Sequence, residues 1–122
     1  MLKRNPHFKP ITVGLYLIRE LVPTDWKIFR RLYLQALKDA PTIFPDDYSV
    51  LKKYSDQEWE NQLKQTYNDP RSVLVGVFVQ TNELVGLIKV SGETNSGMIH
   101  AANILGVYMQ KNYQEKEVQK LL

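Results

Sequence analysis

The chain has 122 residues, of which 43% are hydrophobic and 24% are charged, and these values predict one soluble globular domain with a single core. It contains no cysteine, which excludes disulfides, cysteine-ligated zinc and a cysteine nucleophile. The net charge of +3 comes from 16 basic residues interleaved with 13 acidic ones, a mixture typical of a solvated surface rather than of a nucleic-acid-binding face.

Metal and membrane sites are also not expected. The two histidines, His7 and His100, have no carboxylates at metal-ligand spacing around them. No segment approaches the ~20 apolar residues that cross a bilayer. The apolar run from Ile11 to Ile18 is short and is not followed by a small-residue cleavage site, so we expect a cytoplasmic protein without membrane contact.

The N-terminal residues 1–14 are predicted to form a basic arm, and residues 15–122 the folded domain. Pro6 and Pro10 interrupt the arm. The alternation from Leu15 to Leu21 predicts a first strand. Its two sides are expected to carry Leu15, Leu17 and Leu21 on one and Tyr16 and Ile18 on the other.

A first helix is predicted after Pro23, which ends the strand. Thr24 can cap this helix, and the negative charge of Asp25 suits the positive end of the helix dipole. Apolar residues at three- and four-residue steps predict a buried face made of Trp26, Phe29, Tyr33, Ala36, Leu37 and Ala40. Pro41 ends the helix.

A second helix is predicted from Ser55, after a linker over residues 41–54. Ser55 and Glu58 have the spacing of a capping box, and Tyr54 can pack on Trp59 as a hydrophobic staple. The buried stripe continues through Trp59, Leu63 and Tyr67 until Asp69 and Pro70 end the helix.

The remainder of the chain predicts three strands and a short helix. They cover Val73 to Val79, Leu84 to Val90, Met98 to Met109 and Gln114 to Leu122. The first strand is apolar almost throughout, so we expect both of its faces to be covered. Thr81-Asn82-Glu83 forms a turn to the second strand, and Gly106 suggests a bulge in the third. The element order is β-α-α-β-β-β-α.

The segment from Ile104 to Leu122, taken with this element order, resembles the GNAT superfamily of N-acetyltransferases. In that family a fourth strand leads into a loop of pattern Gln/Arg-x-x-Gly-x-Gly/Ala, and a helix follows. The matching loop here comprises Gln114, Glu115, Lys116, Glu117, Val118 and Gln119. Gly106-Val107-Tyr108-Met109 looks like the end of the fourth strand, and Tyr113 precedes the loop.

The resemblance implies an α+β fold with a mainly antiparallel sheet flanked by helices, and acetyl-CoA as the acyl donor. Backbone N–H groups at the start of a helix bind anions, so the loop would hold the pyrophosphate. The backbone of Val107 and Met109 would bind the pantetheine arm. A small-molecule or peptide amine would then attack the thioester directly, with Phe44 and Tyr48 near the acceptor. No catalytic residue is identified.

Two departures from the family pattern affect these expectations. Glu117 and Gln119 stand where the family has glycines. A carboxylate and a phosphate ~4 Å apart repel by about 1 kcal/mol in water and ~4 kcal/mol at an effective dielectric constant near 20, so acetyl-CoA binding should be weakened by about one to three decades. The C-terminal third of the family fold is expected to be missing, which would leave the edge of the last long strand open to a second copy.

Several alternatives remain open at this stage. The first is an impaired acetyltransferase, and the second is a non-catalytic GNAT remnant that acts as a homodimer or protein-binding module. His100 could be a general base but fits a structural strand residue better, and Glu93 fits a solvated loop residue. The linker residues Phe44, Asp46, Asp47 and Tyr48 could recognise an amine or could anchor the linker. Trp26 and Trp59 are expected in the core.

Overall fold

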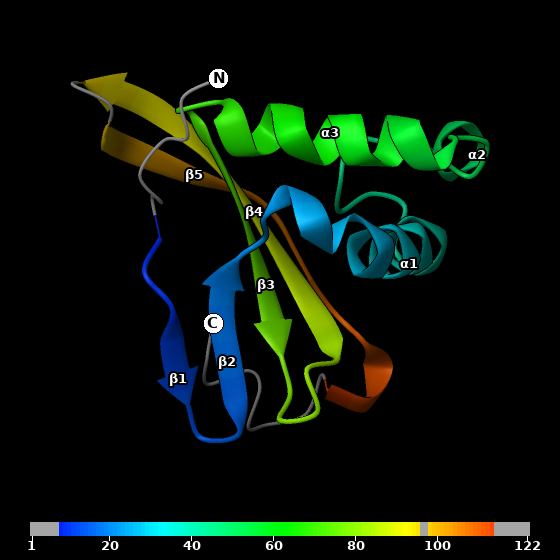
Figure 1. Ribbon diagram of the computed structural model, residues 1–122, viewed down its shortest axis with the longest axis horizontal. Helices are drawn as coiled ribbons and strands as arrows, with labels where there is room; N and C mark the ends of the chain where they lie inside the picture. Colours follow the sequence, from blue (N-terminus) through cyan, green and yellow to red (C-terminus); the bar gives the residue numbers. More distant parts are fainter. Residues whose placement is uncertain (1–7, 96–97, 114–122) are drawn as a thin grey trace.

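The structure, a computed structural model, describes residues 8–95 and 98–113, with the backbone alone described for 93–95 and 98–102. It contains a five-stranded antiparallel sheet in the order β1-β2-β3-β4-β5 (Figure 1). The strands are β1 (Ile11–Val13), β2 (Tyr16–Glu20), β3 (Ser72–Phe78), β4 (Leu84–Asn95) and β5 (Met98–Met109). The helices are η1 (Pro23–Asp25), α1 (Trp26–Asp39), α2 (Tyr48–Leu51), α3 (Asp56–Asn68) and η2 (Lys111–Tyr113). The predicted α+β class is confirmed.

Strand β1 was not predicted, because residues 11–14 were assigned to the N-terminal arm. It forms a hairpin with β2, in which Gly14 occupies the turn with φ 58°. Glycine adopts this left-handed conformation without the steric cost that a side chain brings. Leu15 lies exposed in this turn, and not on the strand as predicted. Strand β1 has only three residues, all of them exposed, so no hydrophobic pattern in the sequence marks it.

Helix α1 has the buried face that its periodicity predicts, with Leu32 in addition. The buried residues are Phe29, Leu32, Tyr33, Ala36 and Leu37. Thr24 does not cap the helix, because a turn of 3-10 helix precedes α1 and makes Asp25 its N-cap. The carboxylate of Asp25 instead accepts hydrogen bonds from the Val22 N–H, at 2.8 Å, and from both terminal nitrogens of Arg19.

Helix α3 starts as the sequence predicts. The Glu58 N–H donates to Ser55 Oγ at 3.2 Å, and the Ser55 N–H donates to Glu58 Oε1 at 3.1 Å, which completes the capping box. The rings of Tyr54 and Trp59 are 5.7 Å apart, as in a hydrophobic staple. Trp59 is fully buried, and Trp26 is half-buried against the same cluster.

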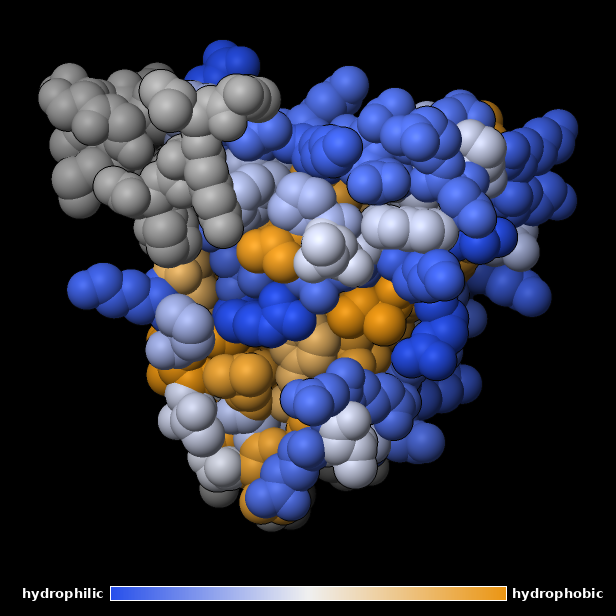
Figure 2. All heavy atoms as spheres, in the orientation of Figure 1, coloured by the Kyte–Doolittle hydropathy of each residue, from blue (hydrophilic) through white to orange (hydrophobic). Residues whose placement is uncertain are grey.

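The sheet has an aromatic-rich face and a valine-rich face. The helices α1, α2 and α3 pack against the first, where Phe29, Tyr33, Phe44 and Trp59 form a ring cluster. The second face carries Ile18, Val73, Val75, Val77, Val85 and Met109. Strand β3 therefore has both faces buried, as predicted. On the face seen in Figure 2, hydrophilic side chains cover most of the helical part, and hydrophobic ones gather over the strands.

Strand β5 contains a bulge beside Gly106, which confirms the prediction. Lys89 pairs with Gly106 and Val90 with Ile104, so Leu105 is the extra residue. A side chain at position 106 would collide with the linker, because a Cβ there would lie 2.7 Å from the Ile43 carbonyl oxygen and 2.7 Å from a ring carbon of Phe44. Gly106 thus lets the linker approach the end of β5.

Candidate functional site

The outer edge of β5 is the first feature of the candidate site. The Gln110 N–H donates to the Val85 carbonyl oxygen at 2.9 Å, so the backbone of Gln110 faces β4. In an antiparallel pair, successive residues direct their N–H and C=O groups alternately to the two sides of the strand. With the register of Tyr108 opposite Leu87, the backbone of Tyr108 also faces β4, and that of Val107 faces away from it.

This edge carries no partner strand within residues 8–95 and 98–113, since β4 is the only described neighbour of β5. The N–H and C=O of Val107 therefore point away from β4, to a side of β5 on which no described strand lies. The backbone of Met109 also faces away from β4, and its side chain is buried in the valine-rich face. An extended ligand with amide groups could hydrogen-bond along this edge as an added strand does.

Helix α1 lies beside this edge, on the face of the sheet that the helices cover. The Tyr108 hydroxyl donates to Asp39 Oδ2 at 3.0 Å, and Gln110 Nε2 donates to Gln35 Oε1 at 3.4 Å. Burial, the hydrogen bond to Asp39 and the Asp39 charge raise the pKa of Tyr108 to about 12. The last turn of α1 is thereby fixed to the end of β5. Asp39 and Gln35 were not predicted as site residues.

Phe44 was predicted near the acceptor, but the structure places it in the core. It is 3% exposed, its ring centroid is 5.2 Å from that of Tyr33, and its ring covers Gly106. The Tyr33 hydroxyl donates to Asp46, and burial together with this hydrogen bond raises the pKa of Tyr33. For Phe44 and Asp46 the alternative of an anchored linker fits the structure, because both are held by Tyr33.

The other linker residues take part in helix α2. Asp47 caps this helix by accepting from the Ser49 N–H and hydroxyl, both at 2.9 Å, and these bonds lower the pKa of Asp47. Tyr48 is half-buried at the start of α2, with Lys52 Nζ 5.6 Å from its ring centre. Tyr48 is therefore accessible to a ligand in part, and Phe44 is not.

Part of the predicted site lies outside the described residues. This applies to the whole of the predicted pyrophosphate loop, namely Gln114, Glu115, Lys116, Glu117, Val118 and Gln119. The side chains of His100 and Glu93 are outside the description as well. Of the predicted cofactor contacts, Val107 and Met109 are the two that the structure places, and it places them on the same strand edge.

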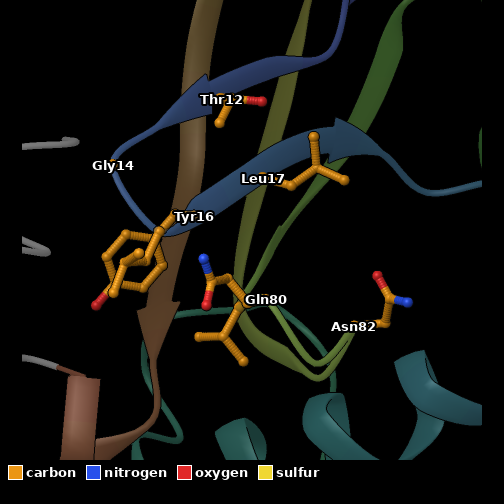
Figure 3. Close-up of a pocket in the computed structure, with 8 residues that line it drawn as sticks. Thr12, Gly14, Tyr16, Leu17, Gln80 and Asn82 are labelled. Atoms are coloured by element: carbon orange, nitrogen blue, oxygen red, sulfur yellow. The ribbon is translucent and has the colours of Figure 1, made fainter.

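A shallow pocket of about 200 Å³ lies elsewhere, between the β1–β2 hairpin and the β3–β4 turn (Figure 3). Thr12, Tyr16, Leu17, Gln80 and Asn82 are among the residues around it. None of its 8 lining residues carries a charge at neutral pH, and none comes from β5 or α1. It is therefore separate from the candidate site.

Neither a metal-binding cluster nor a membrane-spanning helix is found in the described part of the chain. There, no group of three or more histidines, aspartates or glutamates could hold a metal ion. No helix of that part is long and apolar enough to span a bilayer.

Comparison of the fold with solved structures finds acetyltransferases. The chain is similar to the ribosomal-protein-S5-alanine acetyltransferase of Vibrio fischeri, with a TM-score of 0.72 at 14% identity, over 93% of this chain and 62% of that one. It is also similar to the ribosomal L7/L12 α-N-protein acetyltransferase RimL in complex with coenzyme A, with a TM-score of 0.67 at 16% identity, over 91% and 61%.

A third structure, a GNAT-family acetyltransferase from Streptococcus pneumoniae, matches with a TM-score of 0.61 at 17% identity, over 88% of this chain and 61% of that one. By sequence, no protein-family model and no curated protein matches the chain. The chain thus spans a little over three fifths of the length of these structures. Across most of its length, it has the fold of the GNAT acetyltransferases.

Proposed function

We propose that this chain binds acetyl-CoA along the outer edge of β5 and transfers the acetyl group to a primary amine. The observation that carries the proposal is the orientation of Val107, whose N–H and C=O face away from β4 on an edge without a described partner strand. The pantetheine arm contains amide groups that can pair with such an edge. The fold and the coenzyme A complex of one similar structure support the same ligand.

The chemistry follows from direct transfer between the two substrates. An unprotonated amine nitrogen attacks the thioester carbonyl, the carbon–sulfur bond breaks, and the amine gives up one proton as coenzyme A leaves as the thiol. Two of the similar structures are named as acetyltransferases of ribosomal proteins, which supports a peptide α-amine as the first acceptor to test.

The proposed pyrophosphate loop, residues 114–119, should bind weakly. Glu117 adds a negative charge next to the phosphates, and the side chains of Glu117 and Gln119 occupy positions at which glycine lets the backbone approach an anion. We propose that this loop lowers the affinity for acetyl-CoA without changing where the ligand lies.

Calorimetric titration with acetyl-CoA tests the proposal. Saturable heat is expected from the unmodified chain, and tighter binding from a variant with Glu117→Gly and Gln119→Gly. Val107→Pro should weaken binding because proline has no N–H to donate. Thr12→Pro is the matched control, since Thr12 lies in β1, the opposite edge strand of the described sheet. Absence of binding by all four proteins would refute the proposal.

A second candidate function is a non-catalytic module that pairs with another copy through the same edge. Ile104 and Leu105 favour it, since they are 67% and 45% exposed on β5. An edge strand with exposed apolar side chains is a template for pairing with another chain. This candidate predicts a dimer whose population rises with concentration and no response to acetyl-CoA.

A further inference from the structure

We propose that the carboxylate of Asp39 receives the positively charged amine of the acceptor. This inference rests on the proposed function, because it assigns an amine site to the same end of β5. It starts from the hydrogen bond of 3.0 Å that the Tyr108 hydroxyl donates to Asp39 Oδ2. Tyr108 lies between Val107 and Met109 in β5, so the residue that orients Asp39 is next to the proposed cofactor edge.

The position of Asp39 favours a cation. It is the last residue of α1, where the helix dipole places partial negative charge beside the carboxylate. Asp39 is exposed, and no described lysine or arginine forms an ion pair with it. One of its oxygens accepts the tyrosine hydroxyl, so the carboxylate has further capacity to accept from an ammonium group.

The neighbouring aspartates are less suited to this role. Asp46 is half-buried and accepts the Tyr33 hydroxyl inside the linker. Asp47 is occupied by the Ser49 N–H and hydroxyl as the cap of α2. Neither has a described hydrogen bond to β5, whereas Asp39 is bonded to Tyr108 directly.

The proposed amine site also includes Gln35, which lies one helical turn before Asp39 in α1, and Gln110, which follows β5. Their side-chain amides meet at 3.4 Å and are exposed beside Asp39 and Tyr108. An acceptor with an amide next to its ammonium group could therefore hydrogen-bond to these side chains while its charge lies at Asp39. The α-amine of a peptide has this arrangement, which identifies it as the class of acceptor that fits the site.

Nuclear magnetic resonance titration of the ¹⁵N-labelled chain tests this without acetyl-CoA. The probes are alanine amide, which carries an ammonium group at neutral pH, and N-acetylalanine amide, which does not. Alanine amide should give saturable shifts at Gln35, Asp39, Tyr108 and Gln110, and the acetylated probe should not. Asp39→Asn should weaken the binding of alanine amide by about fivefold, the size of a partly exposed ionic contact.

Asp47→Asn is the control, because asparagine also caps helices and the described hydrogen bonds of Asp47 go to Ser49 and not to β5. It should leave the titration unchanged. Tyr108→Phe keeps the ring but releases Asp39, so a smaller loss of amine affinity is expected. Three results would overturn the inference: chemical-shift changes scattered over the chain, changes of equal size for the two probes, or changes that Asp39→Asn does not alter.

The acetyl-CoA titration of the same variants separates this inference from the proposed function. Asp39→Asn should bind acetyl-CoA as the unmodified chain does. If acetyl-CoA fails to bind but alanine amide binds at Asp39, the amine site stands and the acetyltransferase proposal falls. If acetyl-CoA binds and alanine amide does not, the cofactor edge stands and Asp39 is not the amine site.

Discussion

At the scale of a single residue, Gly106 allows the linker to pack against β5. Its missing side chain leaves room for the Ile43 carbonyl and the Phe44 ring, and the backbone it contributes leads directly to Val107 and Tyr108. The linker and β5 therefore meet at one glycine, two residues before the tyrosine whose hydroxyl donates to Asp39 of α1. Adding one methyl group at position 106 tests how much the close approach of the linker contributes to the stability of the fold.

Gly106→Ala should lower the free energy of unfolding by about 1–3 kcal/mol, the usual cost of overfilling a packed site. The added Cβ would lie 2.7 Å from a backbone oxygen, which cannot move as a flexible side chain does. Urea denaturation measures the loss, and near-ultraviolet circular dichroism should report altered packing of Tyr33 and Phe44. Gly14→Ala serves as the comparison, because a Cβ there meets nothing within 4 Å, although φ is 58°. That variant should lose stability with an unchanged aromatic spectrum.

Tyr108 gives the stability of the fold a dependence on alkaline pH. Its pKa is raised from the ordinary value of 10 to about 12, first by burial and then by its bond to Asp39. A group whose pKa is higher in the folded state stabilises the fold fully below the unfolded pKa and loses that contribution as pH rises to the folded pKa. Between pH 10 and 12 the unmodified chain should therefore lose more stability than Tyr108→Phe. Equal losses in urea denaturation at the two pH values would contradict this role.

At the scale of elements, the helices depend on local signals that act over a few residues. In α3 the exchange of hydrogen bonds between Ser55 and Glu58 satisfies two N–H groups that the helix itself cannot bond. Ser55→Ala removes the side-chain acceptor, so it should lower the free energy of unfolding by about 1 kcal/mol. Ser55→Thr retains a hydroxyl and should stay within a few tenths of a kcal/mol of the original. Thermal denaturation of the unmodified chain and the two variants measures this difference. Equal midpoint temperatures would show that the cap does not stabilise the fold.

The same locality explains which elements could be predicted from the sequence. The apolar period of α1 and the capping box of α3 lie within single segments, and the structure contains both. Strand β1 and helix α2 have three and four residues, which is too few for a period to emerge. The start of α1 was misplaced because Asp25 binds Arg19, six residues earlier in the chain, and the pattern around Thr24 does not show this contact.

Of the predicted cofactor contacts, the structure places only those that lie on a strand, and their role in binding stays a prediction. The resemblance pointed to Val107 and Met109, and the register with β4 places both on the outer side of β5. No sequence pattern marks Asp39 as part of the proposed amine site, because Asp39 is 69 positions away from Tyr108, whose hydroxyl donates a hydrogen bond to it. Phe44 was misassigned since the sequence places it in a linker, while packing on Tyr33 and Gly106 places it in the core.

At the scale of the whole molecule, the sheet has a helix-covered face, a valine-rich face and two edge strands among the described ones. Strands β4 and β5 have twelve residues each and extend past β3, which has seven (Figure 1). The outer edge of β5 is therefore long, and the proposed ligand contact at Val107 occupies only one part of it. Ile104 lies further along the same strand, beyond the bulge.

The exposed apolar part of this edge should make the chain associate with itself as its concentration rises. Ile104→Lys places a charge on the edge, which natural sheets use to prevent strand pairing, and it should lower the associated fraction in sedimentation velocity. Ile104 is 67% exposed, so the variant should keep its thermal stability. Val50→Lys is the matched control, because Val50 is 53% exposed on α2 and is not part of β5, so this variant should leave association unchanged. Equal reduction by both variants would mean that general surface charge, and not the β5 edge, controls association. If association falls only in Ile104→Lys while acetyl-CoA binding is retained, strand pairing and cofactor binding use separate parts of β5.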